Sequence, residues 1–143
     1  MAHVAGLLLA DTSAWHHSGS QWVAARWRRE LDDDRIATTA PVRLEVLFSA
    51  QSARDYDAIA RELSAVRQLA CGDDAWARAL DVQRRLAHKQ GLHHRSVKMP
   101  DLLVAAVAEL GGAVVWHYDE DFDRIAAVTG QTTEWLAPRG SLA

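Results

Sequence analysis

The chain has 143 residues, of which 49% are hydrophobic and 24% charged, and its formal net charge is −3. The length is typical of one domain and the composition of a globular protein, and the charge excludes a globally basic nucleic-acid binder while allowing a local basic strip. No apolar run approaches the roughly twenty residues of a membrane span, so no membrane association is expected. A single cysteine, Cys71, excludes an internal disulfide framework, and with no signal-peptide pattern this favours a cytoplasmic protein.

The stretch from Leu7 to Ser13 is a short aliphatic run that ends on an acid and two hydroxyls. This pattern favours a strand buried on both faces of a parallel sheet, although run length alone leaves a buried helix open. Ligands of such sheets lie at the carboxyl ends of the strands. Asp11 is therefore expected at the edge of the sheet where chemistry is usually done.

A helix is expected next over residues 21–31, with Val23, Trp27 and Leu31 at four-residue spacing on its buried face. Trp22 belongs to the opposite face. It is expected to pack at the edge of the helix, and the alternative is an exposed side chain that marks a surface for a partner.

Residues 36–39 are short and β-branched, which predicts a second strand, and Pro41 suits the first turn of the helix that follows. That helix carries Glu45 among valine, leucine and phenylalanine side chains. Glu45 is either a surface acid or an ion-pair partner of Arg43, unless other carboxylates converge on it.

Two amphipathic helices are expected over residues 53–67 and 73–89, and we interpret both as scaffold or as a dimer face. Trp76, Leu80 and Leu86 share one side of the second helix. Tryptophan at helical spacing is typical of a core position, so Trp76 is expected to be buried.

The segment 91–98 is the most basic part of the chain and contains no acid. Its side chains suited to phosphate contacts are His93, His94, Arg95 and Lys98. The histidines are also candidates for metal binding or acid–base catalysis, but adjacent histidines on a loop point in different directions.

Residues 100–108 begin with proline and aspartate and continue with small and aliphatic residues on nearly every face. A helix that is apolar all round is buried. Asp101 stands at the start of this helix, where an acid also complements the helix dipole.

Residues 113–116 form another buried run, which ends in polar residues that include Asp119 and Asp121. The pattern of the first strand is thus repeated. A short helix from Phe122 and an edge strand over residues 133–136 complete the expected elements.

Strands that alternate with helices predict an α/β fold with a mostly parallel sheet, whose strand ends share one rim. The acids expected at this rim are Asp11, Glu45, Asp101 and Asp119. Crowded carboxylates repel one another unless a cation compensates, and oxygen-only ligands favour Mg²⁺ or Mn²⁺ over zinc. Magnesium held in this way is typical of phosphoryl chemistry.

Four fragments together resemble the PIN domain. They are Asp11-Thr12-Ser13-Ala14 after a hydrophobic strand, Glu45 in an apolar helix, Pro100-Asp101 with Ala105-Ala106 behind it, and Asp119-x-Asp121-Phe122 after another strand. Their order and spacing match over almost the whole chain. A solitary domain of this length is similar to the VapC toxins of bacterial toxin–antitoxin pairs.

The resemblance implies a three-layer α/β/α domain over residues 1–143 and a magnesium-dependent endoribonuclease, usually a dimer and neutralised by a small antitoxin. It assigns the catalytic and metal-binding quartet to Asp11, Glu45, Asp101 and Asp119. It makes Asp121 a fifth metal contributor and Thr12 and Ser13 supporting hydroxyls. The RNA backbone would be held by Arg95, Lys98, His93 and His94. The chain departs from the pattern at His117, where many relatives have threonine or serine.

Two other functions remain open. A magnesium-dependent phosphatase or phosphotransferase would keep the metal site, but the haloacid-dehalogenase-like enzymes carry a second aspartate where this chain has Ser13. A catalytically inactive RNA- or protein-binding module would keep the fold, although the presence of all four acids disfavours it. The sequence does not indicate which RNA is cut or whether one or two metal ions bind.

Overall fold

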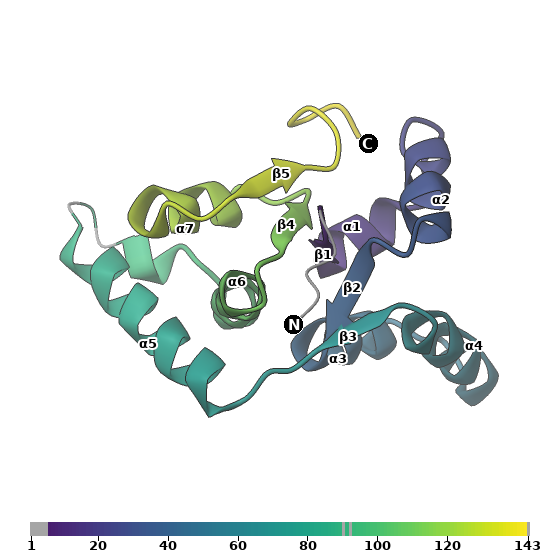
Figure 1. The fold of residues 1–143 in the computed structure, drawn as a ribbon, viewed down its shortest axis with the longest axis horizontal. Coiled ribbons are helices and arrows are strands. Elements are labelled where there is room, and N and C mark those ends of the chain that lie inside the picture. Colours follow the sequence, from purple (N-terminus) through teal and green to yellow (C-terminus); the bar gives the residue numbers. More distant parts are fainter. Residues whose placement is uncertain (1–5, 90, 92, 143) are drawn as a thin grey trace.

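The computed structural model describes residues 6–89, 91 and 93–142. Within these residues the centre is a five-stranded sheet in which every neighbouring pair is parallel, in the order β3-β2-β1-β4-β5 (Figure 1). The strands are β1 (Leu8–Ala10), β2 (Ile36–Thr39), β3 (Arg67–Leu69), β4 (Val114–His117) and β5 (Thr133–Trp135). The expected α/β class is confirmed. The strand order reverses between β1 and β4, which is where parallel sheets usually bind ligands.

The helices alternate with the strands along the chain. They are α1 (Thr12–His17), α2 (Ala24–Asp32), α3 (Ala40–Phe48), α4 (Ala53–Ser64), α5 (Asp73–His88), α6 (Met99–Leu110) and α7 (Asp121–Thr129), with a 3₁₀ turn η1 (His93–Arg95) before α6. Leu92, in the predicted basic segment, lies outside the described residues.

Local chemistry fixes several helix ends. Ser52 caps α4 by accepting a hydrogen bond from a first-turn N–H, and Pro41 and Pro100 occupy the first turns of α3 and α6. Gly130 ends α7 at φ 73°, a left-handed conformation that glycine adopts without a steric penalty.

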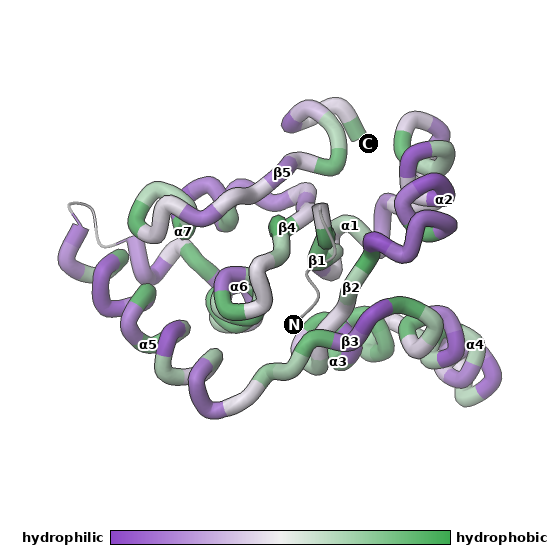
Figure 2. Tube along the Cα trace, in the orientation of Figure 1, coloured by the Kyte–Doolittle hydropathy of each residue, from purple (hydrophilic) through white to green (hydrophobic). Residues whose placement is uncertain are grey.

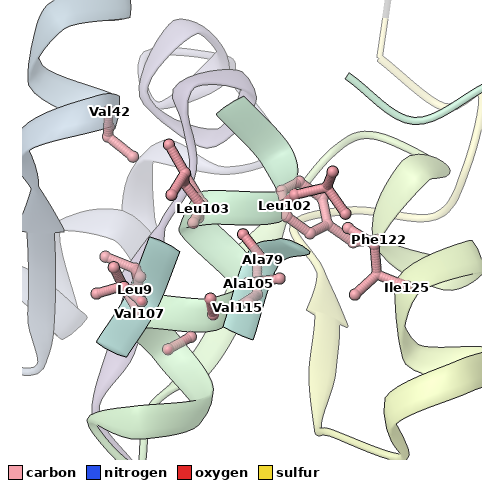
Figure 3. Close-up of a cluster of buried hydrophobic side chains, with 14 of the residues drawn as sticks. Leu9, Val42, Ala79, Leu102, Leu103, Ala105, Val107, Val115, Phe122 and Ile125 are labelled. Carbon is pink, nitrogen blue, oxygen red and sulfur yellow. The ribbon is translucent and has the colours of Figure 1, made fainter. Parts of the chain in front are cut away.

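Alternate strand residues face two different helical layers. Leu9 and Val115 face the layer built from α3, α5, α6 and α7, and Figure 3 shows them with Phe122 of α7 in one apolar cluster. Leu8 and Trp116 face α1 and α2 on the other side. The sheet is therefore covered on both faces, as the expected three-layer α/β/α arrangement requires.

Helix α6 is the most deeply buried helix of the structure. Its residues 101–108 are all buried, and Figure 2 shows this helix as mostly hydrophobic. In α2 and α5, in contrast, hydrophobic and hydrophilic residues alternate (Figure 2). The prediction of a central helix is confirmed. One consequence is that Asp101, in its first turn, is carried into the interior with it.

The first expected helix is wrong in its start and in part of its face. Residues 12–17 already form α1, and α2 begins only at Ala24, so Trp22 lies on the turn before it and is 78% exposed. Leu31 is 42% exposed, because Glu30 is the buried residue in the last turn of α2. The Glu30 carboxylate accepts a hydrogen bond from the Arg35 guanidinium.

The expected burial of Trp76 is also wrong, since 56% of this residue is exposed. The buried stripe of α5 consists of Ala75, Ala79, Val82 and Leu86, so Leu86 is buried as expected, whereas Ala75 and Ala79 take the buried places expected for Trp76 and Leu80. The small alanine side chains let α5 approach α6 closely. The face of α5 that carries them therefore packs against α6, and the face that carries the bulky Trp76 indole does not.

The predicted helix over 53–67 ends at Ser64, and β3 follows as an edge strand that the sequence did not reveal. β3 has exposed polar residues and no alternating pattern, so it has none of the usual signals. None of the helices in the described residues is both long and apolar enough to span a membrane.

Candidate functional site

Five acids meet where the carboxyl ends of β1 and β4 reach the rim of the sheet. Carboxylate oxygens of Asp11, Glu45 and Asp101 lie within 4.8 Å of one another, and we call these residues the first triad. Asp101, Asp119 and Asp121 satisfy the same distance and form the second triad. Asp101 belongs to both, so the two triads are contiguous.

Ser13 fixes Asp11 and joins the two strand ends. Oδ2 of Asp11, the capping residue of α1, accepts hydrogen bonds from the Ser13 N–H at 3.1 Å and the Ser13 hydroxyl at 2.7 Å. The Ser13 oxygen in turn accepts the Tyr118 N–H at 2.9 Å, just beyond β4. The other carboxylate oxygen of Asp11, Oδ1, is buried and has no hydrogen-bond partner within the described residues.

Glu45 is tied to the same helix start. The Thr12 hydroxyl donates to Glu45 Oε1 at 2.9 Å, across from α1 to α3. The alternative in which Glu45 pairs with Arg43 is not observed: among the described residues, no lysine, arginine or histidine nitrogen lies within 4.0 Å of the carboxylate of Glu45 or Asp11. Asp11 and Glu45 of the first triad therefore have no basic partner among the described residues, and only Asp101, which the two triads share, lies near a lysine.

The second triad, in contrast, is already paired with cations. Lys98 Nζ lies 2.6 Å from Asp119 Oδ2 and 3.8 Å from Oδ2 of both Asp101 and Asp121. Arg124 contacts the other oxygen of Asp121 at 3.0 Å. The sequence placed Lys98 beside the acids as a phosphate contact, whereas the structure places its ammonium group among them.

Burial and mutual repulsion decide the protonation of the cluster. Burial, together with the negative charge of Asp11, raises the pKa of Asp101 to about 9, and burial raises the pKa of Asp11 as well. Partial burial would raise the pKa of Asp119 too, but the hydrogen bond from Lys98 brings it below its ordinary value. Without a metal, Asp101 therefore keeps its proton at neutral pH.

The residues present fit a divalent metal ion. Asp11 Oδ1 and Asp101 Oδ2 are buried carboxylate oxygens without a hydrogen-bond partner among the described residues, and both belong to the first triad. An unpaired buried carboxylate is costly, and a hard cation would remove that cost. Perturbed acids gathered at a strand-end rim are also typical of a functional site.

The structure brings most of the predicted site residues together. Those at the rim are Asp11, Thr12, Ser13, Glu45, Lys98, Asp101, Asp119 and Asp121. His93, His94 and Arg95 form η1, just before α6, and within the described residues no hydrogen bond or ion pair joins their side chains to the acids. The roles of these residues remain predictions.

Sequence reasoning did not identify two features of the site. One is the pairing of Lys98 with Asp101, and the other is the pairing of Arg124 with Asp121, both at a three-residue spacing. A three-residue spacing places two side chains on the same face of a helix, so this spacing in the sequence could have predicted both pairs. His117 is fully buried, and burial lowers its pKa to about 4, so a neutral imidazole accepts the Asp119 N–H at 3.2 Å.

Comparison with known proteins finds consistent matches. The family model described as the PIN domain matches residues 8–128. Ribonuclease VapC18 of Mycobacterium tuberculosis is 57% identical over 92% of this chain and 96% of its own length. A crystal structure of DNA-bound VapBC from Salmonella typhimurium is similar with a TM-score of 0.72 and 17% identity, covering 92% of this chain and 99% of that chain. VapBC-5 of Mycobacterium tuberculosis, from the VapBC family of toxin–antitoxin systems, gives a TM-score of 0.58 and 25% identity over 92% of this chain and 98% of its own.

The buried acid makes a prediction about stability. In the metal-free protein, the free energy of unfolding is expected to fall as the pH rises from about 7 to 9. The pKa of Asp101 is raised from 3.8 to about 9 on folding, so the folded state holds a proton that the unfolded state has lost. One such proton gives a slope of at most about 1.4 kcal/mol per pH unit. His117, whose pKa is lowered from 6.5, acts in the opposite direction only at lower pH.

Urea unfolding at a series of pH values in the presence of a chelator measures this slope. Asp101→Asn should reduce it, because asparagine does not titrate, and any slope that remains comes from Asp11, whose pKa burial also raises. Asp57→Asn, on the exposed side of α4, is the matched control and should keep it. A slope that persists unchanged in Asp101→Asn would contradict the assignment.

Proposed function

The chain belongs to the PIN-domain family and, within it, to the VapC ribonucleases, and from this premise we propose that it is a magnesium-dependent endoribonuclease that hydrolyses RNA phosphodiester bonds. The observation that carries the proposal is the first triad, in which three acids converge and neither Asp11 nor Glu45 has a basic partner among the described residues. We further propose that the protein is the toxin of a toxin–antitoxin pair and acts in the cytoplasm.

The donor set supports Mg²⁺, with Mn²⁺ as a substitute. The first triad offers only carboxylate oxygens, from Asp11, Glu45 and Asp101. Oxygen ligands of this kind suit small hard cations, whereas zinc sites usually contain histidine or cysteine. Asp119 and Asp121 complete the acidic rim next to them.

The mechanism follows from how the chain positions these acids. When bound, a divalent cation lowers the pKa of a water molecule and neutralises charge on the scissile phosphate. Ser13 holds Asp11 in one orientation, and Thr12 holds Glu45. Glu45 is only partly buried, so its carboxylate reaches solvent and is suited to accept a proton from the attacking water. The chain needs no nucleophile of its own.

RNA would be held beside the acids by the turn η1. Arg95 is exposed there, and the two residues before it, His93 and His94, are partly buried. Contacts from such side chains to phosphates position the substrate without reading its sequence. Lys98 has its ammonium among the acids, so we assign the backbone contacts first to Arg95.

The central prediction concerns cleavage. Purified protein should cut structured RNA in the presence of Mg²⁺ or Mn²⁺ and lose this activity in a chelator. Asp101→Asn and Asp11→Asn should each lower the rate by about 10²-fold or more, because each removes a charge that holds the cation. A gel-based assay with end-labelled RNA measures the rate, and Asp57→Asn is the control that should retain it. Cleavage by Asp101→Asn that a chelator does not diminish would disprove the proposal.

A second prediction concerns RNA affinity. Arg95→Ala should weaken RNA binding and reduce the slope of log affinity against log salt by about 1, as expected for the loss of one phosphate contact. Fluorescence anisotropy of labelled RNA at several salt concentrations measures both quantities. Arg84→Ala, on the exposed side of α5, is the matched control. An unchanged salt slope in Arg95→Ala would show that this contact is not made.

We propose a small antitoxin protein as the regulatory partner. The solved structures that resemble this chain include VapBC complexes, and VapBC-5 is described as a member of a toxin–antitoxin family. Co-purification with the product of a short neighbouring reading frame, together with loss of RNA cleavage in the complex, would support this partner.

We propose a homodimer formed by an apolar patch on α3, α5 and the start of α6. The patch consists of Leu44, Trp76, Leu80 and Met99, which are 71%, 56%, 65% and 73% exposed. Two adjoining hollows run through it, and Glu45 lies at the edge of one of them. Large apolar side chains gathered on one surface favour an interface, and a second copy would bury the same patch on both subunits.

The dimer makes its own prediction. Leu80→Glu places a charge in the centre of the patch, where it should convert the dimer to a monomer while the fold remains. Light scattering coupled to size-exclusion chromatography measures the mass. Leu31→Glu, at a residue that is 42% exposed on α2 and lies on the other side of the sheet, should remain dimeric. A native protein that is monomeric at high concentration would contradict this interface.

The phosphatase alternative is less well supported. The Ser13 oxygen is engaged with both Asp11 and the Tyr118 N–H. The position where haloacid-dehalogenase-like enzymes have their second aspartate therefore serves here to orient Asp11. Hydrolysis of p-nitrophenyl phosphate without RNA cleavage would favour this alternative over the ribonuclease.

A further inference from the structure

The two triads differ in the charge that already faces them. In the second triad, Lys98 Nζ is within 4 Å of all three carboxylates, and Arg124 adds another cation. In the first triad, Asp11 Oδ1 has no hydrogen-bond partner within the described residues, and the known partner of Glu45 is the uncharged Thr12 hydroxyl. The second triad is therefore neutralised from within the chain, whereas in the first only the shared Asp101 lies near a basic group.

Lys98 is fixed in this place by its backbone as well as by its ammonium group. Its N–H donates to Asp121 Oδ2 at 3.2 Å, and its carbonyl accepts the Asp101 N–H at 3.1 Å. Lys98 is also the capping residue of α6, at the positive end of the helix dipole, where a cation is disfavoured. The acids must offset this cost, so the amine is directed toward them.

We propose that the ammonium of Lys98 takes the place of a second divalent cation, so that the protein binds one divalent ion, at the first triad. This inference rests on the proposed metal-dependent function and specifies its cation count. The ammonium uses Oδ2 of Asp119 and lies near the same Asp101 oxygen that has no hydrogen-bond partner. A second metal ion would need these oxygens and would be repelled by the positive charge between them.

Lys98 is then a positioning residue. It holds Asp119 and Asp121 as neutralised neighbours, so that Asp101 contributes its charge to the first triad. This role differs from that of a phosphate contact. It determines how many metal ions the protein binds, and it does so even when no RNA is present.

Mn²⁺ binding to the full chain tests this, with no RNA present. Electron paramagnetic resonance measures free Mn²⁺ during titration and gives the number of ions bound per chain. The native protein should bind one Mn²⁺, and Lys98→Met should bind two. The only other lysine, Lys89, is exposed, and Lys89→Met is the matched control, which should bind one. Lys98→Arg keeps the charge and should also bind one.

The outcomes separate the inference from the function on which it rests. Two ions in the native protein, or one ion in a folded Lys98→Met, would overturn the role of Lys98 and leave the metal site in place. No binding by the native protein would overturn both. If Lys98→Met fails to fold, as judged by circular dichroism, the native count and the Lys98→Arg count still decide: one ion in each supports the inference, and two ions in either overturns it.

Discussion

The repulsion among five carboxylates at one rim of a parallel sheet is the constraint on which the rest of this structure depends. Asp11 and Asp101 are almost completely buried, and their proximity to each other raises the cost of ionising both. A fold can maintain such a cluster only if protons, basic side chains or metal ions balance it. Basic side chains balance the second triad, the raised pKa of Asp101 favours a proton on that acid, and the buried oxygens of the first triad without a hydrogen-bond partner mark where a metal ion would complete the balance.

The scaffold holds the cluster in place through a few connections between distant segments. Ser13 joins the end of β1 to the residue after β4, and Thr12 joins α1 to Glu45 on α3. The buried helix α6 carries Asp101 to the same point, because its apolar sides are enclosed by α3, α5 and α7. The acids are thus positioned by elements whose own packing is apolar: Asp11, Asp101, Asp119 and Asp121 lie at or near the ends of these elements, and Glu45 lies within α3.

Family membership and site geometry support the same function by independent routes. The match to the PIN domain and the 57% identity to a VapC ribonuclease come from the sequence as a whole. The geometry adds which oxygens are paired and which are not, and that distinction leads to the proposal of a single cation position. The apolar patch lies beside Glu45, so a partner at the patch would also form one wall of the site.

The sequence by itself determined the α/β class, most strands and helices, and the acids that converge, because buried strands and a buried helix leave continuous apolar runs and their polar ends stand out. It did not determine β3, whose exposed polar residues carry no pattern, or the buried face of α5, where alanines rather than Trp76 face α6. Only the tertiary structure decided the place of Lys98. Whether a lysine contacts solvent, phosphate or carboxylate depends on groups brought from β4 and α7, more than twenty residues away along the chain.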